Sequence, residues 1–340
     1  MNHMASARSR GSALRIATRL ALAVIAFCLC AWLVLRFAFG VGLYSESIAS
    51  SGLEIEPVSV PVSGAQLAAE LFRPTDTTAS GRPGVVLVHG TSPDGRSLVL
   101  YQILARHLAS RGVIVLLYDQ RGYGDSPDPT RNAAGEYELP WVADAAQAAS
   151  FLSRQPGVDP RNLRLLGHSF GGSVAIGVSQ LPGIACTLGR ILVLSPGRGL
   201  NDSGDDPFAF RAGRLSTDMG LEPPLTRDDA RTMYASMEVE TLLAGTAGVP
   251  AVLLHTGEEE AKRPLGPQVA TSGSSVEFKV LPGTGHYFGT NRAFNDRGLP
   301  IKVYDAEPLA GLVDEILAPA TRVAGNCGND HSPTDGAVLR

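Results

Sequence analysis

The sequence has few charged residues and only four cysteines, and each shortage excludes a class of protein. Charged side chains make up 18% of the 340 residues and apolar ones 44%, a composition typical of a folded chain rather than a disordered one. The net charge of -4 gives no indication of a basic surface for nucleic acid. Cysteine and histidine do not cluster at zinc-site spacing, and no repeat has the period of a solenoid or propeller.

One long apolar stretch near the N-terminus stands apart from this composition. Four arginines precede the run LALAVIAFCLCAWLVL at residues 20–35, and apolar residues continue past Arg36 to Tyr44. Together they reach the roughly 20 residues that a membrane helix needs. We therefore predict a cytoplasmic segment over residues 1–15 and a transmembrane signal anchor over residues 16–44. The alternative is a cleaved signal peptide, although no A-x-A cleavage site follows the run.

The arginines around this stretch predict its orientation. Positive charges favour the cytoplasmic side of a membrane, and Glu46 is the first charge after the span. The rest of the chain would then face the periplasm or the extracellular side. An oxidising compartment would permit a disulfide between Cys186 and Cys327, but the sequence cannot show whether they are close, so their pairing stays open.

From residue 45 to residue 319, short apolar runs alternate with helical patterns, which predicts one α/β domain. The first two strands should form an antiparallel pair, and the βα units after them predict a mostly parallel sheet with helices on both faces. The expected strands are 53–62, 65–74, 83–90, 113–119, 162–167, 189–196, 249–257 and 276–283, and the expected helices are 97–110, 139–155, 170–181, 227–243 and 306–319.

Residues 197–249 interrupt this alternation at the position of a cap. They are polar and rich in proline and glycine, with one expected helix over residues 227–243 and no strongly apolar helical pair. We therefore expect a short cap insert rather than a large lid. The final residues, 320–340, are small and polar and are predicted to be disordered.

The stretch GHSFGG at residues 167–172 is the strongest chemical signal in the sequence. It follows an expected strand and opens an expected helix, which is the context in which G-x-S-x-G forms a nucleophile elbow. Its glycines permit a tight turn that exposes the hydroxyl of Ser169. The alternative interpretation is a glycine-rich turn in which the serine has no chemical role.

A serine hydroxyl needs a general base before it can attack an acyl carbon at neutral pH. Of the seven histidines, His286 is the best placed, because it follows the last expected strand in a glycine-rich loop on the carboxyl side of the sheet. His89 ends a strand, and His168 adjoins Ser169 but should point away from it. The other histidines are typical of surface or core positions. His286 is therefore the predicted base.

A carboxylate must hold the imidazole in its catalytic tautomer. Three consecutive acids, Glu258, Glu259 and Glu260, follow the expected strand 249–257, so an acid stands between the serine and the histidine in the order typical of this architecture. A run of three acids is also typical of a solvated turn. Position alone leaves the choice among them open.

A serine nucleophile also needs hydrogen-bond donors for the oxyanion. The backbone N–H of Phe170, directly after the serine, is one expected donor, and the second should come from the loop after strand 83–90, where Thr91 lies. The alternative interpretation of this second loop is a plain strand-to-helix turn.

These motifs together resemble the α/β-hydrolase superfamily over residues 53–318. The resemblance rests on the segments VVLVHG, YDQRGYGDS, GHSFGG, HTGEEEAKRP and GTGHYF, which occur in that order. The nearest subgroup looks like the serine aminopeptidase and monoacylglycerol-lipase-like hydrolases. In the acid loop, the resemblance places the triad acid on Glu260, with Glu259 second, although most members carry aspartate there.

The resemblance implies a serine hydrolase that cleaves an ester, thioester or amide of a small to medium acyl substrate, without a cofactor or metal. The predicted signal anchor would attach this hydrolase to a membrane. Ser169, His286 and Glu260 would form its triad, and the N–H groups of Thr91 and Phe170 its oxyanion hole. The alternatives are an aminopeptidase of the proline-aminopeptidase type, an acyltransferase, or a catalytically inactive binding module at the membrane surface.

Overall fold

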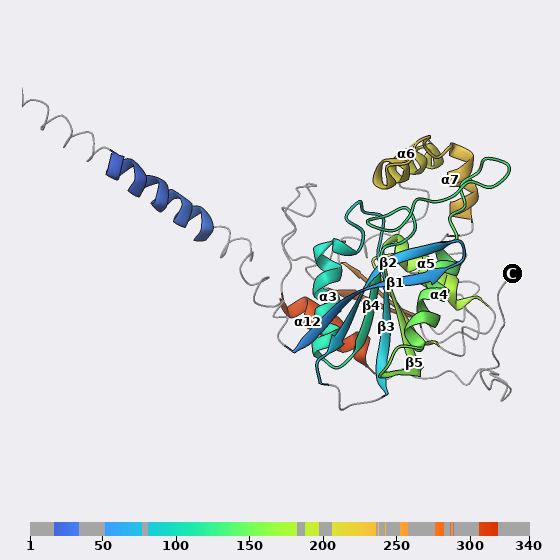
Figure 1. Cartoon of the computed structure of the whole chain (residues 1–340), viewed down its shortest axis with the longest axis horizontal. Helices are drawn as coiled ribbons and strands as arrows, with labels where there is room; N and C mark the ends of the chain where they lie inside the picture. The colour runs from blue at the N-terminus through green and yellow to red at the C-terminus, as the bar shows by residue number, and fades with distance from the viewer. Residues whose placement is uncertain are drawn as a thin grey trace, which may run out of the picture.

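Eight strands form one open sheet in the order β1-β2-β4-β3-β5-β6-β7-β8 (Figure 1). The structure is a computed structural model, and it describes residues 17–33, 52–76, 81–181, 188–196, 206–235, 237, 242, 252–257, 276–281, 286, 288 and 306–318. The strands are β1 (Leu53–Val62), β2 (Ala65–Pro74), β3 (Arg82–Val88), β4 (Ile114–Tyr118), β5 (Val158–His168), β6 (Leu188–Leu194), β7 (Val252–Gly257) and β8 (Val276–Leu281).

The helices lie mainly between the strands in sequence. They are η1 (Gly95–Ser97), α3 (Val99–Ser110), α4 (Trp141–Ser153), α5 (Phe170–Ser179), α6 (Pro207–Met219), α7 (Arg227–Ala235) and α12 (Ala306–Leu317). The β1–β2 and β2–β4 pairs are antiparallel, and every other strand pair is parallel. The mostly parallel sheet and the leading antiparallel pair are therefore confirmed.

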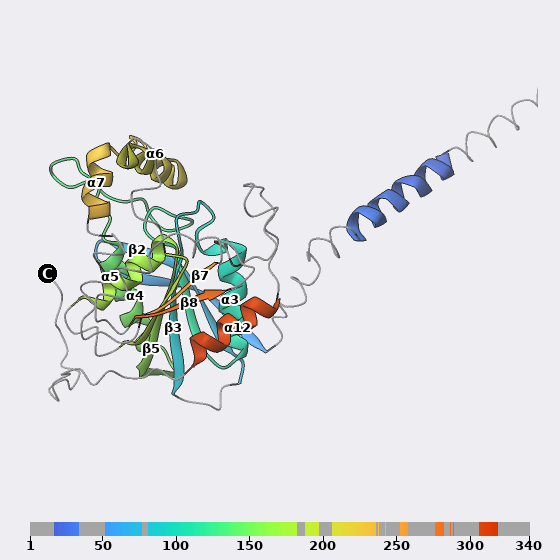
Figure 2. The ribbon, with the colours of Figure 1, turned by 180° about the vertical axis from the view of Figure 1, so that it is seen from behind.

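Strand β3 is buried on both faces, which explains its continuous apolar run. On β3, Val86 and Val88 face the core that α4 and α5 cover, whereas Val85 and Leu87 face the core under α3 and α12 (Figures 1 and 2). All four side chains are almost completely buried. Burying each such side chain stabilises the fold by about 1.5–3 kcal/mol.

The order of the strands reverses direction at β3. Strand β3 lies between β4 and β5 in the sheet. After β3 the chain forms β4 on one side of it, whereas after β5 it forms β6 on the opposite side. Ligands of open α/β sheets bind at such a reversal of strand order, outside the carboxyl ends of the strands. The loops after β3 and β5, which carry Thr91 and Ser169, meet there.

The expectation of a single helix in the cap was wrong, because α6 and α7 form a packed pair there. Helix α6 begins with a cap that the sequence contains: the side chain of Asp206 accepts a hydrogen bond from the N–H of Ala209, and Pro207 takes the first position. It ends at Gly220, which adopts a left-handed conformation with φ 65°. The start and stop signals were present, but the polar composition of the insert masked them.

Residues 17–33 form a further helix. Within the part of the chain that the structure describes, no helix is both long enough and apolar enough to cross a membrane, so the transmembrane helix predicted over residues 16–44 is not found there. The predicted disordered tail, 320–340, and the pair Cys186 and Cys327 lie outside the described residues.

Candidate active site

Ser169 occupies a strained turn between β5 and α5. Its backbone has φ 54° and ψ -123°, a region that residues other than glycine rarely adopt and that costs roughly 1–3 kcal/mol. Two hydrogen bonds hold the turn: the N–H of Ser169 donates to the Leu194 carbonyl at 2.8 Å, and the N–H of Gly172 donates to the Ser169 carbonyl at 3.0 Å. The nucleophile elbow predicted from GHSFGG therefore has the expected strand–turn–helix geometry.

Two glycines allow this turn to press against the end of β3. A Cβ added at Gly171 would collide with the backbone oxygens of Val88 and His89. A Cβ at Gly90 would lie 2.8 Å from the Cβ of Ser169, because the loop after β3 passes directly beside the serine. The close approach of backbone to backbone therefore explains both glycines.

His286 is brought to Ser169 as the sequence predicts. Its Nε2 lies 3.1 Å from the Oγ of Ser169, and both side chains are half-buried. This distance is within the range in which an imidazole can accept the serine proton. The three candidates for the acid of the predicted triad, at 258–260, lie outside the described residues.

The two predicted oxyanion donors also flank Ser169. Phe170 is the first residue of α5, and Thr91 follows Gly90 in the loop that touches the serine. Among the described residues, neither backbone N–H has a hydrogen-bond partner. Phe170 lies at a helix N-terminus, which favours a negatively charged ligand, and Thr91 lies in the neighbouring loop, so the arrangement can accept an oxyanion.

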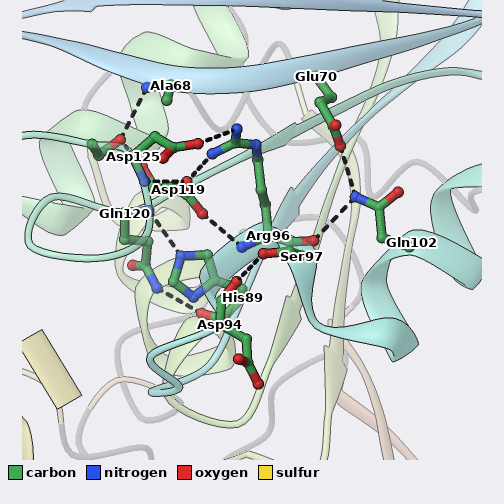
Figure 3. Close-up of polar contacts among 11 residues, drawn as sticks. Ala68, Glu70, His89, Asp94, Arg96, Ser97, Gln102, Asp119, Gln120 and Asp125 are labelled. Carbon is green, nitrogen blue, oxygen red and sulfur yellow. Dashed lines mark hydrogen bonds and ion pairs between the residues drawn. The ribbon is translucent and has the colours of Figure 1, made fainter.

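The loop after β3 is fixed by His89, which the sequence indicated only as the end of a strand. Its Nδ1 donates to the Gly90 carbonyl at 2.6 Å. Its Nε2 accepts the backbone N–H of Gln120 at 2.8 Å (Figure 3). The Gln120 side chain donates in return to the His89 carbonyl at 2.6 Å. Burial lowers the pKa of His89 below its ordinary value of 6.5, which favours this neutral tautomer.

Asp119 ties the same loop to the loop after β4. Its buried carboxylate accepts the backbone N–H of Arg96 at 2.6 Å and that of Asp125 at 2.9 Å, and it pairs with the Arg96 guanidinium (Figure 3). Arg96 also reaches Asp125 at 2.7 Å. A single carboxylate therefore holds two loops beside the sheet edge where Ser169 lies.

Two further residues of the YDQRGYGDS segment, Arg121 and Ser126, have structural partners too. Arg121 forms a buried, bidentate ion pair with Asp144, with both distances 3.0 Å. The hydroxyl of Ser126 donates to the Asp119 carbonyl at 2.7 Å and accepts the N–H of Ala68 at 3.0 Å. The motif thus serves as a brace for the loops around the site, a role that the resemblance alone did not reveal.

The ring of Phe170 connects the elbow to the cap. It packs edge-on against Trp141, with ring centroids 4.9 Å apart, and against Tyr234 of α7, with centroids 5.8 Å apart. Behind Trp141, a cavity of about 650 Å³ lies between the start of α4 and α7, with Met233 among its lining residues. The cap helices therefore border the side of the site on which Phe170 lies.

The sequence profile described as the alpha/beta hydrolase family matches residues 85–335. The chain belongs to this family. Among solved structures, the esterase Est22 is similar to this alpha/beta hydrolase, with a TM-score of 0.57 and 17% identity over 81% of this chain and 84% of Est22. At that identity the likeness shows the fold alone. The serine aminopeptidase and monoacylglycerol-lipase-like subgroup stays a prediction.

Curated relatives match shorter parts of this alpha/beta hydrolase. An uncharacterized protein of Mycobacterium tuberculosis is 36% identical over 113 residues, which are 33% of this chain and 37% of the relative. Esterase EstD of Thermotoga maritima is 27% identical over 159 residues, 42% of this chain and 37% of EstD. Thiohydrolase aneE of Aspergillus aculeatus is 32% identical over 97 residues, 28% of this chain and 29% of aneE. The chain therefore spans between 29% and 37% of the length of these relatives.

Proposed function

We propose that this alpha/beta hydrolase is a serine esterase that cleaves a small to medium acyl ester through an acyl-enzyme. The observation that carries the proposal is the 3.1 Å contact between the Oγ of Ser169 and the Nε2 of His286. The serine stands on a strained turn, and the N–H groups of Thr91 and Phe170 beside it have no hydrogen-bond partner among the residues that the structure describes. A glycine-rich turn without chemistry would need none of these features together.

The mechanism follows from this geometry. His286 takes the proton of Ser169 as the serine Oγ attacks the acyl carbon, and the carbonyl oxygen becomes an oxyanion held by the N–H groups of Thr91 and Phe170. The protonated His286 then donates its proton to the leaving group, so the acyl group remains on the serine. Water, activated by His286, hydrolyses the acyl-enzyme and returns the serine to its starting state.

A carboxylate that orients His286 completes the proposed triad. We assign this role to Glu260, with Glu259 as the alternative, because the resemblance of the acid loop places the acid there. Glutamate has one methylene more than the aspartate of most relatives, so its carboxylate has a longer reach. No metal or cofactor enters the proposed reaction.

The relatives favour an ester or thioester over an amide. Esterase EstD and thiohydrolase aneE bear names that describe the cleavage of acyl–oxygen and acyl–sulfur bonds. An amide has a poorer leaving group than an ester, so its cleavage depends more strongly on proton donation by the general acid, His286. We therefore propose an oxygen ester as the main substrate and a thioester as the second candidate.

We further propose that the N-terminal segment attaches the enzyme to a membrane, with the hydrolase domain on the outer side. The helix at residues 17–33 exposes large apolar side chains all along its length, and arginines precede it. The exposed residues include Leu20, Leu22, Val24, Ile25, Phe27, Leu29 and Trp32. Recovery of the full chain with membranes after a carbonate wash would support this attachment; recovery in the supernatant would contradict it.

Labelling with a fluorophosphonate probe tests the proposed function. The probe should label the wild-type chain, and the Ser169→Ala variant, with the same thermal stability, should not react. A panel of p-nitrophenyl esters of graded chain length, with matched thioesters and aminoacyl amides, then ranks the substrates. An unlabelled wild-type chain, or hydrolysis of amides alone, would contradict the proposal.

A further inference from the structure

His168, the residue before Ser169, is buried with only 1% of its surface exposed, and both of its ring nitrogens are engaged. The hydroxyl of Tyr101 lies 2.8 Å from Nδ1, and the backbone carbonyl of His286 lies 2.9 Å from Nε2. The side chain therefore points away from the reacting face, as the sequence predicts. It points instead to the backbone of the proposed base.

The hydrogen bonds fix one proton of this histidine, on Nε2, and assign the role of Nδ1 when the ring is neutral. The carbonyl of His286 can only accept, so the Nε2 of His168 must carry a proton and donate it. In a neutral imidazole the Nδ1 is then an acceptor, and the hydroxyl of Tyr101 donates to it. The oxygen of Tyr101 accepts in turn from the backbone N–H of Gly90 at 2.8 Å.

These bonds form one continuous chain through three loops. It begins at Gly90 in the loop after β3, passes through Tyr101 on α3 and His168 at the end of β5, and ends at His286 after β8. The first loop carries a proposed oxyanion donor, the second the proposed nucleophile, and the third the proposed base. This chain of hydrogen bonds thus links the three backbone segments whose relative positions catalysis requires.

We propose that Tyr101 and His168 form a positioning pair that holds the backbone of His286 at the distance from Ser169 that proton transfer requires. The proposal rests on the serine hydrolase function proposed above. Neither residue touches the reacting atoms, so each acts through His286. A displacement of about 1 Å in an active site can lower the rate roughly 100-fold. Loss of one hydrogen bond to the loop of the base can therefore lower kcat.

The neutral state of His168 has a second consequence. Its ring centroid lies 5.0 Å from that of His286, which becomes a cation during the reaction. A positive charge on His168 at that distance would oppose the formation of the imidazolium. By donating to Nδ1, the hydroxyl of Tyr101 favours the uncharged ring and keeps this repulsion out of the transition state.

Two substitutions of His168 separate positioning from packing. The amide nitrogen of glutamine lies where the Nε2 of histidine does, so His168→Gln keeps a donor for the His286 carbonyl. The amide of asparagine lies where Nδ1 does, so His168→Asn keeps only the contact with Tyr101. We expect His168→Gln to retain kcat within about 10-fold of wild type and His168→Asn to lose about 100-fold, with KM nearly unchanged in both.

A third variant tests the other end of the chain. Tyr101→Phe keeps the ring but removes the hydroxyl that links Gly90 to His168, and we expect kcat to fall about 10-fold at unchanged KM. Thermal unfolding of every variant measures stability separately. Equal kcat values for the glutamine and asparagine variants, or a Tyr101→Phe enzyme with wild-type kcat, would overturn the positioning role.

A measurement that needs no activity keeps this inference distinct from the proposed function. Nitrogen-15 NMR of histidine-labelled wild-type protein, with His168→Gln to assign the signal, reports the tautomer of His168 directly. We expect the Nε2–H form, and the Nδ1–H form would overturn the inference even in an active enzyme. A wild-type chain that shows the Nε2–H form but neither reacts with the probe nor cleaves esters would contradict only the proposed function.

Discussion

The Oγ of Ser169 lies 3.1 Å from the Nε2 of His286, although 117 positions separate the two residues in the sequence. The serine follows β5 and the histidine follows β8, and β6 and β7 lie between these strands in the sheet. The two side chains meet because parallel strands end at one edge, where the loops after β5 and β8 can converge. Residues that belong to no common motif are thereby placed in proton-transfer distance.

The acid of the triad can be identified by neutralising each of the three candidate glutamates separately. We expect Glu260→Gln to lower kcat by about 10³- to 10⁴-fold with KM nearly unchanged, because the imidazole loses the carboxylate that holds its tautomer. Glu258→Gln and Glu259→Gln serve as matched controls of the same chemistry in the same loop and should retain activity. A large loss in Glu259→Gln alone would transfer the role to that residue.

The brace around Asp119 should be required for stability. Its carboxylate is 1% exposed and accepts from two backbone N–H groups and the Arg96 guanidinium, so Asp119→Asn breaks a buried ion pair. We expect the free energy of unfolding to fall by about 3 kcal/mol, at the lower end of the usual range because Arg96 keeps its contact with Asp125. Urea unfolding measures this loss.

An exposed ion pair supplies the control for Asp119. Arg111 and Asp314 are 2.6 Å apart, but their side chains are 51% and 61% exposed. The substitution Asp314→Asn should therefore change the free energy of unfolding by less than about 1 kcal/mol. If both variants lose the same stability, burial of Asp119 does not account for the strength of its contacts.

The sequence predicted the sheet well because buried parallel strands have a simple signature. The run that contains Val85 and Leu87 is apolar at every position, and both of its faces are covered in the structure. The elbow was predicted for a similar reason, because Gly171 and Ser169 belong to a local motif. Local patterns of this kind are visible in a single sequence.

The parts that the sequence did not predict depend on contacts between distant residues. Nothing in the segment around Arg96 indicates that its backbone N–H meets the carboxylate of Asp119, and His89 could be described only as the end of a strand. The chain from Tyr101 through His168 to the His286 carbonyl joins three loops that only the tertiary fold brings together. Helix α6 was missed because tertiary packing stabilises a sequence whose composition resembles a loop.

His89 should make the stability of the protein sensitive to acid. Burial lowers its pKa in the folded state below the ordinary 6.5, so the unfolded chain takes up the proton at a higher pH than the folded one. Acidification therefore favours the unfolded state, and the free energy of unfolding should begin to fall as the pH drops through about 6.5, by up to about 1.4 kcal/mol per pH unit. Urea unfolding between pH 8 and pH 5, values about 1.5 units to either side of 6.5, measures the slope.

Variants of two histidines show which side chain causes the pH dependence of the free energy of unfolding. His89→Gln should flatten the pH dependence, because the titrating ring is gone. Burial also lowers the pKa of His107, on α3, so His107→Gln should remove its own share of the slope. If the slope in His89→Gln equals that of the wild type, the buried ring of His89 does not carry the acid sensitivity.

Two glycines in helices should respond oppositely to the same methyl group. A Cβ at Gly171 would collide with the carbonyl oxygens of Val88 and His89, which cannot move without disturbing β3 and the loop of the proposed oxyanion hole. Gly171→Ala should therefore lower the free energy of unfolding by about 3 kcal/mol or more and reduce the rate of fluorophosphonate labelling. At Gly213, in α6, a Cβ meets nothing within 4 Å, so Gly213→Ala should stabilise the protein by about 0.5–1 kcal/mol, because alanine loses less backbone entropy in a helix. Thermal and urea unfolding of both variants gives the comparison, and a Gly171→Ala protein as stable and as reactive as the wild type would show that the elbow does not need its close contact with β3.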